Sequence, residues 1–191
     1  MAAKGEARER YIETAARLFR RRGYHGVGVA EIVAESGAPR GSFYHHFPGG
    51  KEELALHAVD AAGRFVARLI DEAFEGAADR EAGRRALAGR LADALEASGW
   101  VDGCPVTGIA SDTAGESEAL RLAVAGTFGR WTARAAGHAV RLGAGKAEAE
   151  RWAERLLIEL EGAWIVARAL RSRAPFKAVR VETPRGGRSG P

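Results

Sequence analysis

Apolar residues recur at helical spacing along most of the chain, and glycine or proline separates one such segment from the next. In the first segment Ile12 and Phe19 share a face, with arginine and glutamate between them. Gly23 follows the basic last turn of this segment, where a helix commonly ends. Two shorter segments precede a Pro-Gly-Gly sequence. The pattern predicts helices over residues 6–22, 29–36 and 39–46.

Longer helices are expected after residue 50. Leu54, Ala58 and Phe65 fall on one face of a helix that begins at Lys51. Valine, isoleucine and threonine are few beside alanine and arginine, so the composition favours helix over strand. The sequence therefore predicts an all-α protein. The expected long and intermediate helices cover residues 51–75, 79–97, 105–112, 116–142 and 146–172.

The change in helix length divides the chain. We expect an N-terminal three-helix domain with a helix-turn-helix over residues 1–50, and a C-terminal helical bundle over residues 51–172, whose expected roles are given below. Residues 173–191 are basic, rich in proline and glycine, and show little periodicity. Such a segment is expected to be a disordered basic tail.

Positive charge is concentrated at the start of the chain. Residues 1–51 hold nine basic and five acidic residues, whereas the rest of the chain holds 20 of each. A local basic excess is typical of surfaces that bind polyanions such as DNA, although a solvated basic surface would give the same count.

Composition also indicates the compartment. Cys104 is the single cysteine, so no intrachain disulfide can form, as is usual in a reducing cytoplasm. No apolar run approaches the roughly 18 residues that cross a bilayer. The first ten residues are charged, unlike a signal peptide. We expect a cytoplasmic protein with no membrane partner.

The third predicted helix carries side chains suited to DNA. Arg40 can form two hydrogen bonds with a guanine, and Gly41 permits close approach of the backbone. Lys51, at the start of the next helix, can share a phosphate with free helix N–H groups. Phe43 and Phe47 are interpreted as core. The candidate DNA-binding residues are Arg40, Gly41, Ser42, Tyr44, His45, His46 and Lys51.

Several segments resemble the DNA-binding domain of TetR-type repressors: Gly23-Tyr24, residues 29–34 (VAEIVA), Gly37-Ala38, residues 41–47 (GSFYHHF) and residues 51–54 (KEEL). A link after Phe47 that is one residue longer than usual, together with Gly103-Cys104-Pro105-Val106, resembles the LmrA/YxaF-like branch. Gly28, Val29 and Ala30 depart from the polar residues usual at the start of the second helix, so more of the DNA reading falls to Arg40. The resemblance implies a homodimer, an all-helical ligand-binding core, and release from DNA by a small molecule.

The C-terminal part is apolar and aromatic, as ligand pockets between helices are, although aromatic residues at helical spacing also form ordinary cores. Few polar residues are committed there, so an apolar effector is favoured over a charged metabolite. Cys104 could be a redox sensor at a helix N-terminus, but a buried packing role is preferred, because the chain offers no resolving cysteine. In this branch we expect the pocket to be lined by Phe65, Trp100, Cys104, Val106 and Phe128.

The last two predicted helices carry apolar stripes: Leu120, Val124, Phe128 and Trp131 on one, and Leu156, Leu160, Ala163 and Ala167 on the other. With the same helices of a second subunit they would form a four-helix bundle, or they could pack only within one subunit. A two-fold dimer fits a palindromic operator.

No catalytic site, metal or cofactor is expected. His45 and His46 are adjacent, point about 100° apart on a helix and cannot hold one metal. No predicted strand precedes a glycine-rich phosphate loop. The sequence predicts a ligand-responsive transcriptional repressor rather than an enzyme. The alternative is a DNA-binding regulator without a small-molecule effector.

Overall fold

The computed structural model describes residues 2–179, and that part of the chain is helical without a strand. The all-α prediction is confirmed. From the second helix to the eighth, the predicted bounds lie within two residues of those observed. The elements are α1 (Ala2–Arg22), α2 (Val29–Glu35), the 3-10 helix η1 (Arg40–Ser42), α3 (Phe43–His46), α4 (Gly50–Phe74), α5 (Arg80–Ala97), α6 (Thr107–Thr113), α7 (Glu118–Arg141), α8 (Lys146–Leu170) and α9 (Ala174–Ala178).

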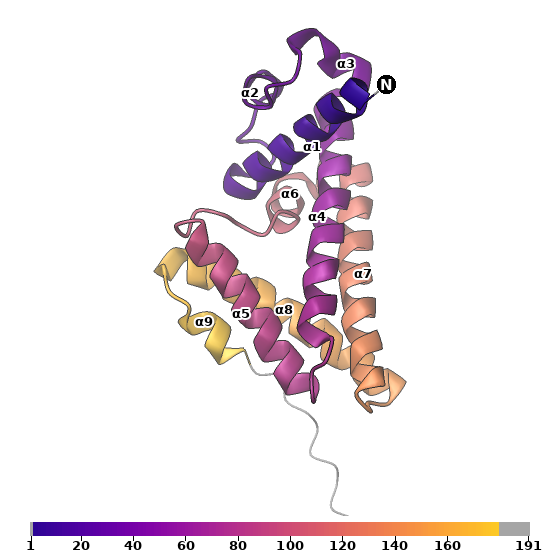
Figure 1. The fold of residues 1–191 in the computed structure, drawn as a ribbon, viewed down its shortest axis with the longest axis vertical. Coiled ribbons are helices and arrows are strands. Elements are labelled where there is room, and N and C mark those ends of the chain that lie inside the picture. Colours follow the sequence, from indigo (N-terminus) through magenta and orange to yellow (C-terminus); the bar gives the residue numbers. More distant parts are fainter. Residues whose placement is uncertain (1, 180–191) are drawn as a thin grey trace, which may run out of the picture.

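Aromatic side chains hold the first three helices together. Phe43 and Phe47 are buried, and their ring centroids lie 5.4 and 6.1 Å from that of Tyr11 on α1. The Tyr11 hydroxyl also donates to the carbonyl of Pro39 at 2.8 Å, which ties α1 to the start of η1. Figure 1 shows α1, α2 and α3 together at one end of the molecule, with α4 leading away from them. This packing fixes the segment 40–46 relative to α1.

Two left-handed glycines make the turns of this unit. Gly23 ends α1 at φ +72°, and its amide donates to the Phe19 carbonyl at 2.9 Å. Gly37, at φ +62°, follows α2. Because L side chains rarely adopt this conformation, both glycines are required by the backbone path. A side chain at Gly23 would also collide with Asp112 at the end of α6.

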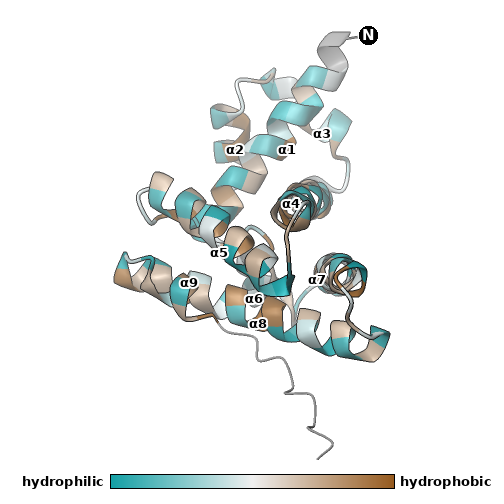
Figure 2. Ribbon diagram, turned by 60° about the horizontal axis from the view of Figure 1, so that its bottom comes forward, coloured by the Kyte–Doolittle hydropathy of each residue, from teal (hydrophilic) through white to brown (hydrophobic). Residues whose placement is uncertain are grey.

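Helix α4 joins this unit to the remaining helices, since it packs on α1 and also on α5 and α7. Asp79 and Ser117 cap α5 and α7, because their side chains accept hydrogen bonds from backbone amides three residues on, at 2.7 and 3.1 Å. Figure 2 shows hydrophobic and hydrophilic residues mixed around the labelled helices, as expected where one face is buried.

The apolar stripes of α7 and α8 pack inside the subunit. Leu120, Val124, Trp131, Leu156, Leu160, Ala163 and Ala167 are all buried. Since α7 packs on both α4 and α8, these helices cover each other's apolar faces. The dimer interface predicted on these stripes is therefore wrong in its choice of face, and packing within one subunit is observed. Other apolar side chains are 46–71% exposed on these helices: Leu122, Val140, Ile158, Ile165, Val166 and Leu170.

The basic tail predicted from residue 173 is helical at its start. Helix α9 has Pro175 in its first turn, which suits a helix N-terminus. Phe176 is only 3% exposed and its ring lies 6.0 Å from that of Trp164. One buried aromatic ring thus orders a segment that composition alone marks as disordered. The rest of the predicted tail, residues 180–191, lies outside the described residues.

Candidate nucleic-acid interface and ligand cavity

Segment 40–46 presents polar side chains outward above buried aromatic rings. Arg40, Tyr44 and His45 are exposed, Tyr44 by 67%, whereas Phe43 is buried. Within the described part of the chain, the Arg40 guanidinium has no hydrogen bond or ion pair. A Cβ at Gly41 would meet no atom within 4 Å, so its backbone is open to a partner. Such outward donors on a short helix can contact base edges and phosphates.

Ser42 and His46 are less available to DNA. The Ser42 hydroxyl donates to the Pro39 carbonyl at 2.8 Å and lies 3.2 Å from the Tyr11 hydroxyl. Its proton is therefore used in the turn that opens η1. His46 is half-buried, with its ring centroid 6.3 Å from that of Tyr11. These two residues hold the segment on α1.

Lys51 lies in the first turn of α4, but its ammonium rests 4.1 Å from the ring centroid of Tyr24. This is a cation–π contact with the turn between α1 and α2. Partial burial lowers the pKa of Lys51, and the nearby charge of Asp112 opposes that shift. Lys51 would thus approach a phosphate from beside Tyr24 rather than from open solvent.

Much of the positive charge near the start of the chain lies away from segment 40–46. Four arginines at the end of α1 form ion pairs, two of them with glutamates of α2 and two with Asp102: Arg17, Arg22, Arg20 and Arg21. In Figure 1 this end of α1 lies near α6, whereas α3 lies near its other end. The charge count therefore overstates the positive charge that faces DNA.

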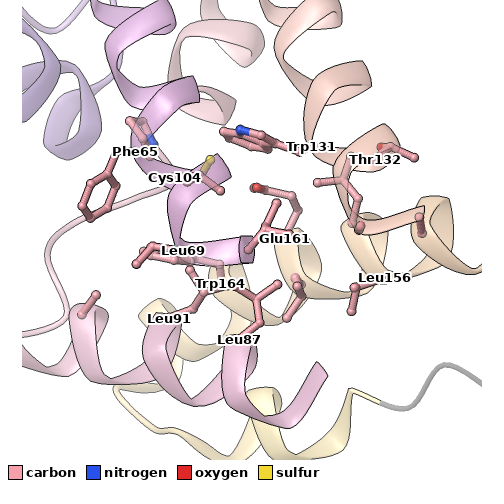
Figure 3. Close-up of a pocket in the computed structure, with 18 of the residues that line it drawn as sticks. Phe65, Leu69, Leu87, Leu91, Cys104, Trp131, Thr132, Leu156, Glu161 and Trp164 are labelled. Carbon is pink, nitrogen blue, oxygen red and sulfur yellow. The ribbon is translucent and has the colours of Figure 1, made fainter. Parts of the chain in front are cut away.

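A mostly apolar cavity lies among α4, α5, α7 and α8 (Figure 3). The space open to the centre of a water-sized sphere is about 130 Å³. An apolar cavity of about 150 Å³ in another protein stays dry and binds benzene. Two residues expected to line a ligand pocket, Phe65 and Cys104, border this cavity. Other wall residues are Leu69, Leu87, Leu91, Trp131, Thr132, Ala135, Leu156, Glu161 and Trp164.

The other three expected pocket residues lie elsewhere. Trp100, at φ +66°, lines a neighbouring open groove. Val106 is fully buried in the core. Phe128 packs against Trp131 at 5.5 Å between ring centroids and does not border the cavity. The face of α7 that borders it begins at Trp131 and continues through Ala135.

Glu161 of α8 is the centre of a polar cluster in the cavity wall. Its carboxyl accepts a hydrogen bond from Thr107 Oγ1 at 2.6 Å and another from the Cys104 thiol. Burial raises the pKa of the Glu161 carboxyl. Burial, and secondarily the charge of Glu161, raises the pKa of Cys104 to about 12. The thiol therefore stays protonated at neutral pH, which favours the packing role over redox sensing.

The sequence does contain a signal for Glu161. It lies on the cavity-facing side of α8, at i+4 from Leu157 and i−3 from Trp164. A carboxyl within an apolar stripe indicates a candidate site, because a buried unpaired carboxylate is costly. A search for apolar and aromatic pocket residues misses it.

Segment 102–108 connects the cavity wall to α1. Asp102 is 6% exposed and borders the cavity. It accepts a hydrogen bond from Arg21 Nε at 2.9 Å and forms an ion pair with Arg20 at 2.5 Å. The Gly103 amide donates to the Arg20 carbonyl at 2.8 Å. A Cβ at Gly103 would lie 2.8 Å from that carbonyl oxygen, so glycine permits this approach. A displacement of the cavity wall would thus act directly on the end of α1.

Two further observations concern residues 2–179 only. No group of three histidine, cysteine, aspartate or glutamate side chains in this range is placed to hold a metal ion. No helix in the range has the length and apolar composition to cross a membrane.

Comparison with known proteins relates both parts of the chain to one family. Residues 12–58 match the model of bacterial regulatory proteins of the tetR family, and residues 81–182 match the C-terminal domain of LmrA/YxaF-like transcriptional regulators. The chain is 34% identical over 184 residues to the uncharacterized HTH-type transcriptional regulator YxaF of Bacillus subtilis, covering 96% of each. It is 38% identical over 127 residues to the HTH-type transcriptional regulator LmrA of that organism, covering 66% of this chain and 68% of LmrA.

Solved structures agree with this relationship. The crystal structure of the regulatory protein TetR from Rhodobacter sphaeroides superimposes with a TM-score of 0.80 at 27% identity, covering 90% of this chain and 94% of that one. A second TetR transcriptional regulator, from Chloroflexus aurantiacus, gives 0.72 at 27% identity, covering 93% and 91%. The chain therefore belongs to the TetR family of DNA-binding transcriptional regulators, with a C-terminal domain of the LmrA/YxaF-like type.

Proposed function

We propose that this regulator is a repressor that binds a palindromic operator as a dimer and leaves it when a small, mainly apolar molecule occupies the cavity. The observation that carries the proposal is the position of Asp102, which borders the cavity and also binds Arg20 and Arg21 of α1. A ligand can shift a conformational equilibrium only by its differing affinity for the two states. Because Asp102 contacts both the cavity and α1, a ligand in the cavity would bind with different affinity to the DNA-binding conformation and to the released one.

In this proposal segment 40–46 enters the major groove. Arg40 reads a base, Gly41 permits close approach, and Tyr44 and His45 contact phosphates, since their side chains are exposed. Ser42 and His46 hold the segment against α1 through their contacts with Tyr11. Lys51 contacts a phosphate beside the N-terminus of α4.

The exposed apolar face of α8 forms the dimer interface. Ile158, Ile165, Val166 and Leu170 fall at i, i+7, i+8 and i+12, so they lie along one side of the helix and are 47–71% exposed. Pairing this face with its copy in a second subunit would remove these side chains from water. It would also set the distance between the two reading segments, which must be about 34–36 Å for successive major grooves.

The size of the cavity limits the ligand. At about 130 Å³ it holds one small ring as it stands, whereas pockets for drug-sized ligands measure about 300–1,000 Å³. A larger effector would have to move the wall. The small volume also favours a second candidate function, a DNA-binding regulator in which the cavity is a packing defect and no effector exists.

Selection of DNA from a random pool by the full chain tests the first part of the proposal. The expected product is a palindrome with half-sites about 10–10.5 base pairs apart. A single non-repeated site would overturn the dimeric mode. Toluene binding, followed by tryptophan fluorescence because Trp131 and Trp164 border the cavity, separates the two candidate functions. A saturable change supports a ligand site, and its absence supports the regulator without an effector.

A further inference from the structure

We propose that the cavity selects an apolar molecule that carries an ammonium group, and that Glu161 is the residue that recognises this group. The inference rests on the proposed ligand-released function and specifies the chemical class of the effector. It revises the purely apolar ligand that the composition of the helices suggests.

Within residues 2–179, Glu161 has no cationic partner. It forms no ion pair with a lysine, arginine or histidine among the described residues, and its two hydrogen-bond donors, Thr107 and Cys104, are neutral. A largely buried carboxyl in such surroundings resists ionisation unless a cation arrives. Burial raises the pKa of the Glu161 carboxyl, as expected where no cation is beside it. A ligand ammonium would supply the missing charge in a place where water screens the pair weakly.

Aromatic rings border the same cavity. Phe65, Trp131 and Trp164 belong to its wall, and Figure 3 shows them around Cys104 and Glu161. The indole N–H of Trp131 donates to the Gly63 carbonyl at 2.9 Å, and that of Trp164 donates to the Asp102 carbonyl at 3.0 Å. Both donors are thus already used, and both rings are held in place. A ligand can then meet these residues only through their ring carbons, and an aromatic ring attracts a cation placed over its face within about 6 Å.

Two other charged residues of the described chain border the cavity, Arg20 and Asp102, and they bear on whether the ligand is a cation or an anion. Arg20 and Asp102 pair with each other at 2.5 Å, and Asp102 also binds Arg21. Arg20 Nε is buried and has no hydrogen-bond partner in the part of the chain that the structure describes, which by itself would favour an anion or a carbonyl group. Arg20 and Arg21 share the one carboxylate of Asp102, but their side chains are 35% and 44% exposed, so solvent also screens them. Glu161 has no ion pair within the described residues. The combination of an unpaired carboxyl and aromatic ring faces therefore favours a cation.

The cavity adjoins an open groove. Four residues border both the cavity and the open groove beside it: Arg20, Cys104, Glu161 and Trp164. Glu161 thus lies where the apolar cavity adjoins the more open groove. An amphiphilic molecule could place its apolar body in the cavity and its ammonium group at this boundary.

The test compares three one-ring probes on the full chain at pH 7: benzylamine, benzyl alcohol and benzoate. Dissociation constants are measured by calorimetry and tryptophan fluorescence. Benzylamine should bind about tenfold more tightly than benzyl alcohol, since a charge-assisted hydrogen bond is about twice as strong as a neutral one. E161Q keeps an acceptor for Thr107 but loses the charge, so it should abolish that preference. E150Q makes the same change at an exposed position of α8 and should leave the preference intact.

The possible results distinguish failure of the ammonium site from failure of the ligand-released function. Equal binding of benzylamine and benzyl alcohol, or an unchanged preference in E161Q, would overturn the ammonium site and leave a ligand cavity standing. Tightest binding of benzoate would assign recognition to Arg20 instead. Binding of none of the probes would overturn both the inference and the ligand-released function. If E161Q does not fold, the preference of the wild-type chain for benzylamine over benzyl alcohol decides alone.

Discussion

An alanine-to-leucine change on α7 should leave stability nearly unchanged where the side chain enters the cavity, and should lower stability one turn away, where it does not. Ala135 is buried and borders the cavity, so Ala135→Leu places three extra carbon atoms in empty space. Burial of these carbons contributes up to about 2.4 kcal/mol at roughly 0.8 kcal/mol each. Ordering a leucine side chain costs about 0.5–1 kcal/mol, and the residual fit costs more. The free energy of unfolding should therefore change by about 0 to +1.5 kcal/mol.

Ala139→Leu is the matched control for this substitution. Ala139 lies one turn later on α7, is fully buried and does not border the cavity, so its extra carbons must overpack the core. A loss of about 1–3 kcal/mol is expected. Urea unfolding of both variants, at one protein concentration because dimerisation would couple to stability, measures the difference. If Ala135→Leu destabilises the protein as much as Ala139→Leu does, the cavity is not the open space described here.

Four further substitutions test the nucleic-acid interface, the dimer interface and the burial of the Glu161 carboxyl. Arg40→Ala should weaken operator binding by about 1–3 kcal/mol and relax the preference at one base pair in DNA selection, whereas Lys51→Ala should weaken all sequences alike and lower the log–log salt slope by about 0.9. An unchanged slope would leave Lys51 with only its contact to Tyr24. Ile158→Glu should give monomers in analytical ultracentrifugation, and a persisting dimer would place the interface elsewhere. The pKa of Glu161 is higher in the folded than in the unfolded chain, so the free energy of unfolding should fall as pH rises from the unfolded to the folded pKa. E161Q should make this fall shallower when urea unfolding is measured over that pH range. The same pH dependence in E161Q and the wild-type chain would contradict the burial of this carboxyl.

Local chemistry made the helices predictable from the sequence. Glycine in a left-handed turn and proline in a first turn act through the backbone of a few residues, as Gly23 and Gly37 do here. The burial of Phe43 and Phe47 followed from the same local periodicity. These features need no knowledge of distant contacts, so the element bounds agree closely with the structure.

Contacts between distant segments could not be predicted in the same way. Periodicity identifies an apolar face of α7 or α8 but not the body that covers it, and other helices of the same subunit cover the faces assigned to a dimer. Likewise, Arg20 and Arg21 count as free positive charge until Asp102, some 80 residues away, is brought beside them. The placement of Phe128 shows the same limit, since a shift of three residues along α7, to Trp131, decides which ring borders the cavity.

The proposed function requires that an occupied cavity weakens operator binding through Asp102 and α1. Fluorescence anisotropy of the selected operator, measured with and without saturating benzylamine in the wild-type chain and in Ala135→Leu, tests it directly. Allosteric coupling of about 1–3 kcal/mol corresponds to a roughly 5–150-fold loss of affinity. We expect a loss of operator affinity in this range for the wild-type chain and none for Ala135→Leu, whose cavity is filled. Unchanged operator affinity in a wild-type protein that calorimetry shows to be saturated with benzylamine would contradict it.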